Sequence, residues 1–217
     1  MAADRKPYRR EAEDKRRQAL IEATLALVSE GGARAATVRA IATRAGVTAG
    51  LIRHYFQTKE ALIVAAYRHL MTEMTNNSAA VLTYAPKDPN ARLAAFVAAS
   101  LRAPVVDGDA VITWASFIQE TRSNPAMLDV HRQTYLAFRN HLDTLIAALP
   151  NAPATPEDQR YLAIACNAVI DGLWLEGSTL PDAFASGELV RIGIRAIGAM
   201  TGVNLTHYLL LSEPPVL

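Results

Sequence analysis

The residues best suited to contact a polyanion lie close together in the segment ATRAGVTAGLIRHYF, residues 42–56. This segment contains Arg53, His54 and Tyr55, and Lys59 follows shortly after it. An arginine can bind a phosphate or the edge of a guanine, whereas histidine and tyrosine suit phosphate oxygens. The chemistry that these side chains favour is therefore binding to a nucleic acid.

Two short helices must position these residues. Thr37 is a suitable N-cap for a helix with the sequence VRAIATRA, and Thr48 for a second helix that ends near Tyr55. Gly46, between them, can adopt the left-handed conformation that a tight turn needs. This spacing is typical of a helix-turn-helix, whose second helix lies in the major groove of DNA, although similar hairpins also occur in protein cores. Apolar residues that can hold the two helices together are Ile41, Ala42, Ala45, Val47 and Ile52.

The charge of the chain is unevenly distributed. Residues 1–68 contain 13 Lys or Arg and 7 Asp or Glu, a balance of +6, although the whole chain has a formal net charge of +1. A basic amino-terminal third favours a polyanionic partner. The first residues form a basic arm that could reach a minor groove or could be a solubilising tail. Its basic residues, and those just after it, are Arg5, Lys6, Arg9, Arg10, Lys15, Arg16 and Arg17.

The whole chain has the pattern of an all-α protein of about nine helices. Apolar residues recur at helical spacing, and no segment shows the alternation of a strand. Proline and glycine predict helices over 14–30, 38–45, 48–55, from 58 onward, 90–103, 109–122, 125–149, from 156 onward, and 184–201. The predicted divisions are a basic arm (1–13), a helix-turn-helix domain (14–68), a ligand-binding and dimerisation domain (69–203) and a tail (204–217). No role is assigned to this tail.

Composition and missing motifs exclude several classes of protein. No run approaches the roughly 18 apolar residues of a membrane span, and the charged start lacks the apolar segment of a signal peptide. Cys166 is the only cysteine, so an internal disulfide is impossible and a reducing cytoplasm is expected. The chain has no Gly-x-Ser-x-Gly elbow, phosphate loop or His-Glu-x-x-His motif. We therefore expect a cytoplasmic protein that is not an enzyme and holds no cofactor.

Metal binding is also not expected. His131 and His141 lie ten residues apart on one predicted helix, which is roughly 15 Å along its axis and too far for one metal ion. Cys166 lies on an apolar helical face, where it is expected to be inert packing. The sequence therefore predicts no metal site.

Residues 15–70 resemble the DNA-binding segment of the TetR family of bacterial one-component regulators. The resemblance rests on the blocks AGVT (45–48), HYF (54–56) and KEAL (59–62). It implies backbone contacts for Thr37 and Arg39, base contacts for Thr48, Ala49, Gly50 and Leu51, and phosphate contacts for Tyr55 and Lys59. Arg53 stands where many members have tyrosine, so a phosphate and a base both remain open as its partner. Phe56 is expected to fix the following helix from the core.

The carboxy-terminal part shows a second, local resemblance. The segment AVIDGLWLEGSTLP (168–181), with Trp114 eleven residues before Pro125, is similar to the choline-responsive, BetI-like repressors of betaine synthesis. Regulators of other responses share this module, so it does not establish choline as the ligand. In the BetI-like repressors, the Asp-Gly-Leu-Trp segment lies on the penultimate helix.

A quaternary ammonium ligand would need aromatic faces, each worth about 0.5–2 kcal/mol, and a carboxylate as counter-charge. The residues that could supply them are Trp114, Phe117, Tyr135, Phe138, Asp171 and Trp174. The alternative for each aromatic is plain core packing, and for Asp171 an ion pair with Arg132, Arg139 or Arg160. Those arginines could instead hold a lipophilic or acidic metabolite.

The last two predicted helices carry broad apolar stripes and small residues that allow close packing. Two such hairpins could form a four-helix bundle between subunits, with Val169, Leu173, Gly193, Ala196 and Met200 near the seam. A two-fold dimer would place two recognition helices about 34–36 Å apart, which matches a palindromic operator. We expect a homodimeric TetR-type repressor that a small-molecule inducer releases from double-stranded DNA. The alternative is a helical ligand-binding or scaffold protein without DNA binding.

Overall fold

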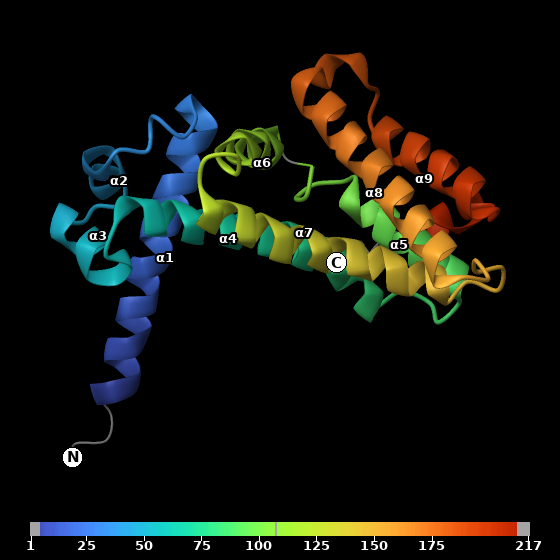
Figure 1. Cartoon of the computed structure of the whole chain (residues 1–217), viewed down its shortest axis with the longest axis horizontal. Coiled ribbons are helices and arrows are strands. Elements are labelled where there is room, and N and C mark those ends of the chain that lie inside the picture. Colours follow the sequence, from blue (N-terminus) through green and yellow to red (C-terminus); the bar gives the residue numbers. More distant parts are fainter. Residues whose placement is uncertain (1–4, 107, 212–217) are drawn as a thin grey trace. The chain divides into compact units, whose positions relative to one another are not determined.

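The computed structural model describes residues 5–106 and 108–211, and the side chains of 13–106 and 108–209. This part contains nine α-helices, three 3-10 helices and no strand (Figure 1), which confirms the predicted all-α class. The α-helices are α1 (Arg5–Gly31), α2 (Val38–Arg44), α3 (Ala49–Phe56), α4 (Lys59–Ala80), α5 (Pro89–Ser100), α6 (Gly108–Glu120), α7 (Pro125–Ala147), α8 (Pro156–Thr179) and α9 (Glu188–Thr201). The 3-10 helices are η1 (Val81–Thr83), η2 (Pro181–Ala183) and η3 (Leu205–Leu211).

Two helices begin away from their predicted positions. The backbone of α1 is helical from Arg5, so most of the predicted basic arm continues the first helix. The side chains of Arg5, Lys6, Arg9 and Arg10 lie outside the described residues. Helix α9 begins at Glu188 and not at 184, because η2 intervenes and Gly187 adopts a positive φ of 69° at the N-cap.

Local hydrogen bonds explain most of the helix starts. The hydroxyls of Thr37, Thr58 and Thr155 accept hydrogen bonds from the backbone N–H three residues later, at 3.2, 3.0 and 3.1 Å. Such bonds satisfy donors that the first helical turn leaves open. Thr48 occupies the N-cap of α3, but its side chain makes no capping bond. The predicted N-cap position of Thr48 is therefore confirmed, and the backbone bond from Leu51 N–H to the Thr48 carbonyl, at 3.0 Å, closes the turn.

The chain divides into two compact units. The amino-terminal unit comprises Met1–Leu70 and Thr113–His131, and the carboxy-terminal unit comprises Met71–Ile112 and Arg132–Leu217. The predicted division at 68/69 thus differs from the division in the structure over Thr113–His131, because this segment packs with the amino-terminal helices. The packing of Tyr67 is the reason: this fully buried ring lies 5.0 Å from the Phe117 ring, and its hydroxyl is 2.6 Å from His131 Nδ1.

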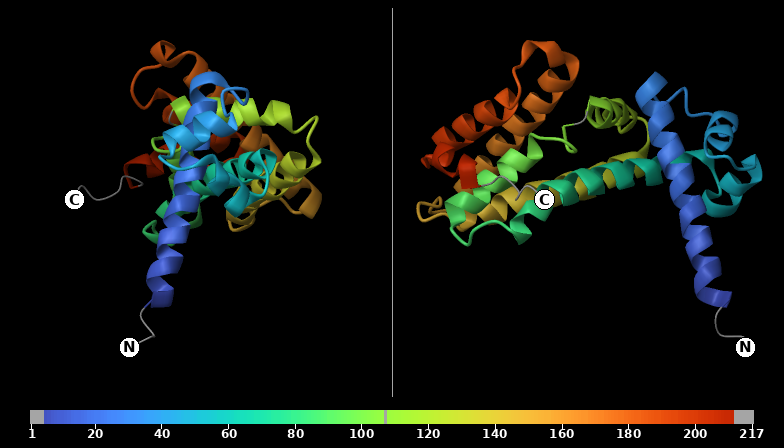
Figure 2. Two further views of the ribbon diagram at one scale, coloured as in Figure 1. Left: turned by 90° about the vertical axis from the view of Figure 1, so that its left-hand side faces the viewer. Right: turned by 180° about the vertical axis from the view of Figure 1, so that it is seen from behind.

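The carboxy-terminal unit is built around α5, which is buried along most of its length. Helices α8 and α9 run side by side as a hairpin (Figures 1 and 2). Helix η3 packs against α5 and α9, with Leu205 only 1% exposed. The described part of the predicted tail therefore docks on its own unit. Residues 212–217 lie outside the described part.

The described residues show no arrangement suited to a metal. They contain no group of three His, Cys, Asp or Glu side chains that could hold an ion. The ring of His141 stacks on Phe96 at 5.7 Å. Cys166 is fully buried, and burial raises the pKa of its thiol to about 12. As for membrane spans, no helix in the described ranges combines the length and hydropathy that a crossing requires.

Candidate nucleic-acid interface and ligand-binding residues

Helices α2 and α3 form a tight helix-turn-helix. Ile41, Ala42 and Ile52 are at most 5% exposed and hold the two helices together. Gly46 adopts a φ of 64°, and the Val47 N–H donates to the Ala42 carbonyl at 3.0 Å. The left-handed conformation that was predicted for the turn glycine is thus confirmed.

The other faces of α3 lie on the surface. Thr48, Ala49, Gly50, Arg53 and His54 are exposed, and Leu51 and Tyr55 are half-buried. The rings of His54 and Tyr55 meet edge to face at 4.9 Å. Within the described ranges, the Arg53 guanidinium has no carboxylate within ion-pairing distance. No described carboxylate therefore neutralises its charge, which favours binding to an external anion.

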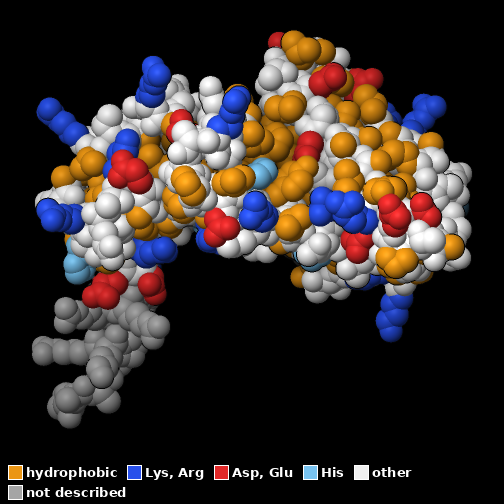
Figure 3. Space-filling model, viewed as in Figure 1, with side chains coloured by type: hydrophobic (Ala, Val, Ile, Leu, Met, Phe, Trp, Pro, Cys, Tyr) orange, Lys and Arg blue, Asp and Glu red, His pale blue; other side chains and the backbone are white. Residues whose placement is uncertain are grey.

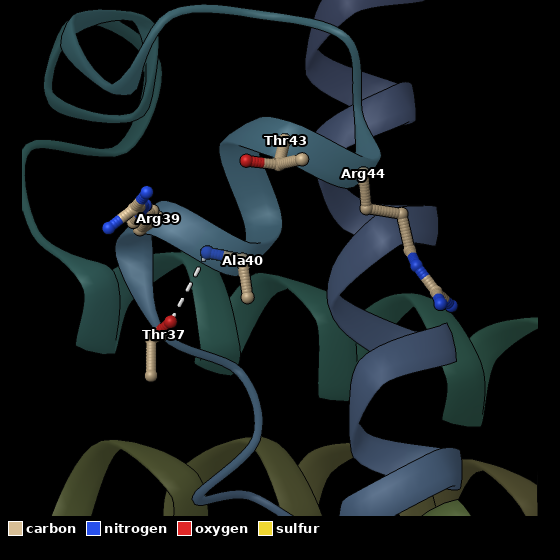
Figure 4. A pocket seen from close by; sticks show the side chains of 5 residues that line it. All are labelled: Thr37, Arg39, Ala40, Thr43 and Arg44. Carbon is tan, nitrogen blue, oxygen red and sulfur yellow. Dashed lines mark hydrogen bonds between the residues drawn. The ribbon is translucent and has the colours of Figure 1, made fainter.

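Two arginines of α2 differ in what they can bind. Arg44 makes a bidentate ion pair with Glu30 of α1, with N–O distances of 2.5 and 2.8 Å, and these bonds raise its pKa. Figure 4 shows Arg44 directed towards α1 and Arg39 directed away from it. Arg39 and Thr37 are exposed at a surface hollow of about 470 Å³. Arg39, unlike Arg44, is thus available to an external anion.

The junction of α3 and α4 brings the remaining predicted phosphate ligand close to α3. Lys59 is the first residue of α4, where backbone N–H groups and the helix dipole favour an anion. Phe56 is 7% exposed, and the Arg17 guanidinium lies 5.0 Å from the centre of its ring. The expected core role of Phe56 is confirmed.

A polar cluster connects α7 and α8 in the carboxy-terminal unit. The Tyr135 hydroxyl donates to Asp171 Oδ2 at 2.6 Å. Asn167 Nδ2 donates to the Tyr135 oxygen at 2.6 Å and to Asp171 Oδ2 at 2.8 Å. Two predicted ligand-binding residues therefore meet, and these bonds take the place of the alternative ion pair between Asp171 and an arginine. Sequence reasoning missed Asn167, although an amide four residues before Asp171 on an apolar helix lies on the same face.

Burial dominates the electrostatics of this cluster. It raises the pKa of Asp171 to about 6, although the hydrogen bonds from Tyr135 and Asn167 favour the ionised carboxylate. Burial also raises the pKa of Tyr135, with a further contribution from Asp171. At neutral pH the half-buried carboxylate is thus mostly ionised, and a cation would relieve the cost of its desolvation.

We expect Asp171→Asn to raise stability at about pH 7.5 and to leave it nearly unchanged at about pH 3, which lies below the pKa of this group in both the folded and the unfolded protein. The pKa of Asp171 in the folded protein lies above that of an unfolded aspartate, about 3.9. This group therefore favours the folded state at low pH, and that contribution is lost as the pH rises through about 6. Asparagine keeps the oxygen that accepts both hydrogen bonds but carries no charge. Thermal unfolding at the two pH values measures the effect.

The exposed Asp182 of η2 provides the control, since Asp182→Asn should not change this pH dependence. A lower stability of Asp171→Asn at the higher pH would contradict the prediction. It would mean that charge-assisted hydrogen bonds outweigh desolvation.

Except for Tyr135, the predicted aromatic residues are buried in the cores of the two units. The rings of Phe138 and Trp174 are 5.6 Å apart and at most 3% exposed. Trp174 Nε1 donates to the Ser100 carbonyl at 2.7 Å. Trp114 and Phe117, also at most 3% exposed, belong to the amino-terminal unit.

The outer face of the α8–α9 hairpin carries exposed apolar side chains. Leu175, Ile192 and Met200 are each about 40% exposed. Figure 3 shows hydrophobic side chains scattered over this hairpin. Val169, Leu173 and Ala196, from the predicted dimer seam, are half-buried. Gly193 faces inward, because a Cβ there would lie 2.2 Å from Leu101 Cδ1 and 3.2 Å from Leu173 Cδ1. Its predicted place at a subunit seam is corrected to the interior of one protomer, where it allows close packing.

The chain is similar to known regulators of transcription over most of its length. Residues 20–66 match the family model of tetR-type bacterial regulatory proteins, and residues 89–202 match that of the C-terminal domain of BetI-type transcriptional repressors. The HTH-type transcriptional regulator BetI of Paraburkholderia phymatum is 33% identical over 178 residues, 82% of this chain and 88% of the relative. A BetI 2 regulator of Chromohalobacter salexigens is 32% identical over 199 residues, 89% and 90% of the two chains.

Solved structures show the same fold. A transcriptional regulator from Pseudomonas aeruginosa PAO1 superposes with a TM-score of 0.80 at 30% identity, covering 90% of this chain and 94% of that one. A regulator from Saccharomonospora viridis, solved in complex with choline, superposes with a TM-score of 0.69 at 21% identity, covering 87% and 96%. These relatives are regulators of transcription and not enzymes. Because family models and relatives agree over most of its length, the chain belongs to the TetR family of transcriptional regulators and has a BetI-type carboxy-terminal region.

Proposed function

We propose that this protein represses transcription by binding a palindromic operator as a homodimer, and that a small molecule bound by its carboxy-terminal part releases it from DNA. The observation that carries the proposal is the surface of α3, whose exposed Arg53 has no neutralising carboxylate among the described residues. A tight turn and a buried contact with α2 hold this helix. That arrangement is suited to a major groove.

The contacts with DNA follow from the position of each exposed group. Small residues at the start of α3, Ala49 and Gly50, let the helix backbone approach base edges. The groups proposed to bind DNA are Thr37, Arg39, Thr48, Ala49, Gly50, Leu51, Arg53, His54, Tyr55 and Lys59. Of these, Thr37, Arg39, Tyr55 and Lys59 are assigned to phosphates, which position the protein and do not read sequence.

The dimer is proposed to form through the outer faces of α8 and α9. Leu175, Ile192 and Met200 offer the apolar area that two hairpins would cover in a four-helix bundle. Val169, Leu173 and Ala196 would lie beside them. A two-fold axis there presents two copies of α3 to successive major grooves.

We expect Ile192→Glu to convert the dimer to a monomer and to weaken operator binding by about 100-fold or more, because one half-site contact replaces two linked ones. Ile192 is 39% exposed, so glutamate is tolerated in the protomer but is desolvated in the dimer. Sedimentation equilibrium and operator titration measure the two effects. Tyr84→Glu, at a tyrosine 83% exposed outside this hairpin, is the matched control. A dimer that withstands Ile192→Glu would place the interface elsewhere.

The inducer is proposed to be a quaternary ammonium compound or another lipophilic metabolite. The ionised Asp171, with Tyr135 and Asn167, provides the negative charge that a cation needs. The complex of the S. viridis regulator with choline makes choline the first compound to test. Binding that favours a dimer with wrongly spaced DNA-binding units would reduce the population able to bind DNA.

The proposal is tested by capture of genomic fragments at low salt. The protein should retain a small set of fragments that share a palindromic site. Choline or betaine aldehyde should release the protein from these fragments, and calorimetry should measure the binding of each compound to the protein. An intact dimer that retains no fragment would support the alternative function, a ligand-binding helical protein without DNA binding.

A further inference from the structure

The single residue between α3 and the cap of α4 has an unusual backbone conformation. Gln57 has φ 68° and ψ −50° and is the one non-glycine residue with a positive φ among those described. The Thr58 N–H donates to the Phe56 carbonyl across it at 2.8 Å. This bond between residues two apart defines a γ-turn of the positive-φ type, which is rare and strained.

The turn is constrained on both sides. The Gln57 N–H donates to the Arg53 carbonyl at 3.1 Å and closes the last turn of α3. On the other side, the Thr58 hydroxyl accepts from the Ala61 N–H at 3.0 Å and caps α4. Glycine would adopt the conformation of Gln57 without a steric penalty. The side chain at this position therefore costs stability, and its direction is set by the backbone around it.

The Gln57 side chain has no internal role that would offset this cost. It is exposed, and its carboxamide forms no hydrogen bond with any other described residue. Gln57 follows Arg53 by four residues, about 6 Å along a helix axis, and precedes Lys59 by two residues. In sequence order, the Gln57 carboxamide with its two N–H donors thus lies between Arg53 and Lys59, two cationic residues that are assigned to DNA.

We propose that Gln57 is a further operator-binding residue, whose carboxamide donates a hydrogen bond to a DNA phosphate beside those bound by Tyr55 and Lys59. This inference rests on the proposed DNA-binding function. The turn fixes the direction in which the Cα–Cβ bond of Gln57 leaves the backbone, and the side chain loses its rotamer freedom when the complex forms. A phosphate is the expected acceptor because helix termini beside the groove meet the DNA backbone.

Two substitutions separate the side chain from the strained turn. Gln57→Gly removes both the side chain and the strain, whereas Gln57→Ala removes the side chain and keeps the strain. We expect both variants of the full-length protein to bind the captured operator fragment roughly 3- to 10-fold more weakly, the value of one hydrogen bond. Only the glycine variant should melt at a higher temperature than wild type. Gly46→Ala, at φ 64° with no atom within 4 Å of a Cβ, is the reverse control and should melt at a lower temperature.

The loss of affinity should be uniform across operator variants, since a phosphate carries no sequence information. Wild-type affinity in Gln57→Ala would overturn the proposal. A loss in the glycine variant alone would also overturn it, because turn rigidity would then be the cause. A loss confined to one base pair would overturn the phosphate contact. Failure of the wild type to bind any fragment would overturn the proposed function first, and this inference with it.

Discussion

Replacing Arg53 with alanine should weaken operator binding by about 1–3 kcal/mol and relax the preference at one base pair, if this arginine reads a base. Arg53 is exposed on α3, and no described carboxylate neutralises it. Titration of a set of operators, each changed at one base pair, measures both effects.

The same titration distinguishes the two partners of Arg53. Arg53→Lys keeps the charge but loses the planar fork that binds a guanine edge through two hydrogen bonds. If Arg53 contacts a base, Arg53→Lys should fail to restore selectivity at that base pair. If it contacts a phosphate, Arg53→Ala should lose affinity equally for all operators, and Arg53→Lys should recover most of that affinity. Arg44→Ala is the matched control: its guanidinium is paired with Glu30, so operator affinity should change little. Unchanged affinity in Arg53→Ala would remove Arg53 from the interface.

Gly198→Ala should destabilise the protein by about 1–3 kcal/mol, the usual cost of overpacking a core. A Cβ at this position in α9 would lie 2.7 Å from the Val203 carbonyl oxygen and 3.5 Å from the Leu205 nitrogen. These are backbone atoms, so the chain leading into η3 must move as a whole. Urea-induced unfolding of the variant and of wild type at equal concentration measures the difference.

Gly172→Ala, in α8, is the matched control for this effect. No atom lies within 4 Å of a Cβ at that position, and the residue is exposed. Alanine should therefore stabilise the protein by about 0.5–1 kcal/mol through the entropy of the unfolded chain and helix propensity. Equal stability of the Gly198→Ala variant and wild type would show that η3 shifts without cost.

The parts of the candidate site that could be predicted are those that depend on neighbouring residues. Thr37, Gly46 and Thr58 mark the two helix starts and the turn because capping and left-handed turns involve residues within one turn of each other. The inward face of α3 followed from the spacing of Ile52 and Phe56. Because Ile52 and Phe56 occupy the inward face of α3, Arg53 lies on its exposed face.

Other features depend on residues far apart in the sequence. The bond between Tyr135 and Asp171 joins side chains 36 residues apart, and that from Trp174 to Ser100 joins residues 74 apart. Periodicity places each residue on a face of its helix, but it does not tell which helix covers that face. For this reason the sequence left both ligand binding and core packing open for the aromatic residues, and only the structure showed that Phe138 and Trp174 pack on each other.

The sequence by itself determined the helical class, the helix-turn-helix and the set of exposed groups on α3, because hydrophobic spacing and capping are local. Only the tertiary structure decided that Gly193 faces the interior, that η3 docks on α5 and α9, and that Asn167 joins Asp171. The strained turn at Gln57 was likewise not evident, since glutamine carries no signal for a positive φ. Its conformation accompanies a connection of only two residues, Gln57 and Thr58, between the end of α3 and the start of α4.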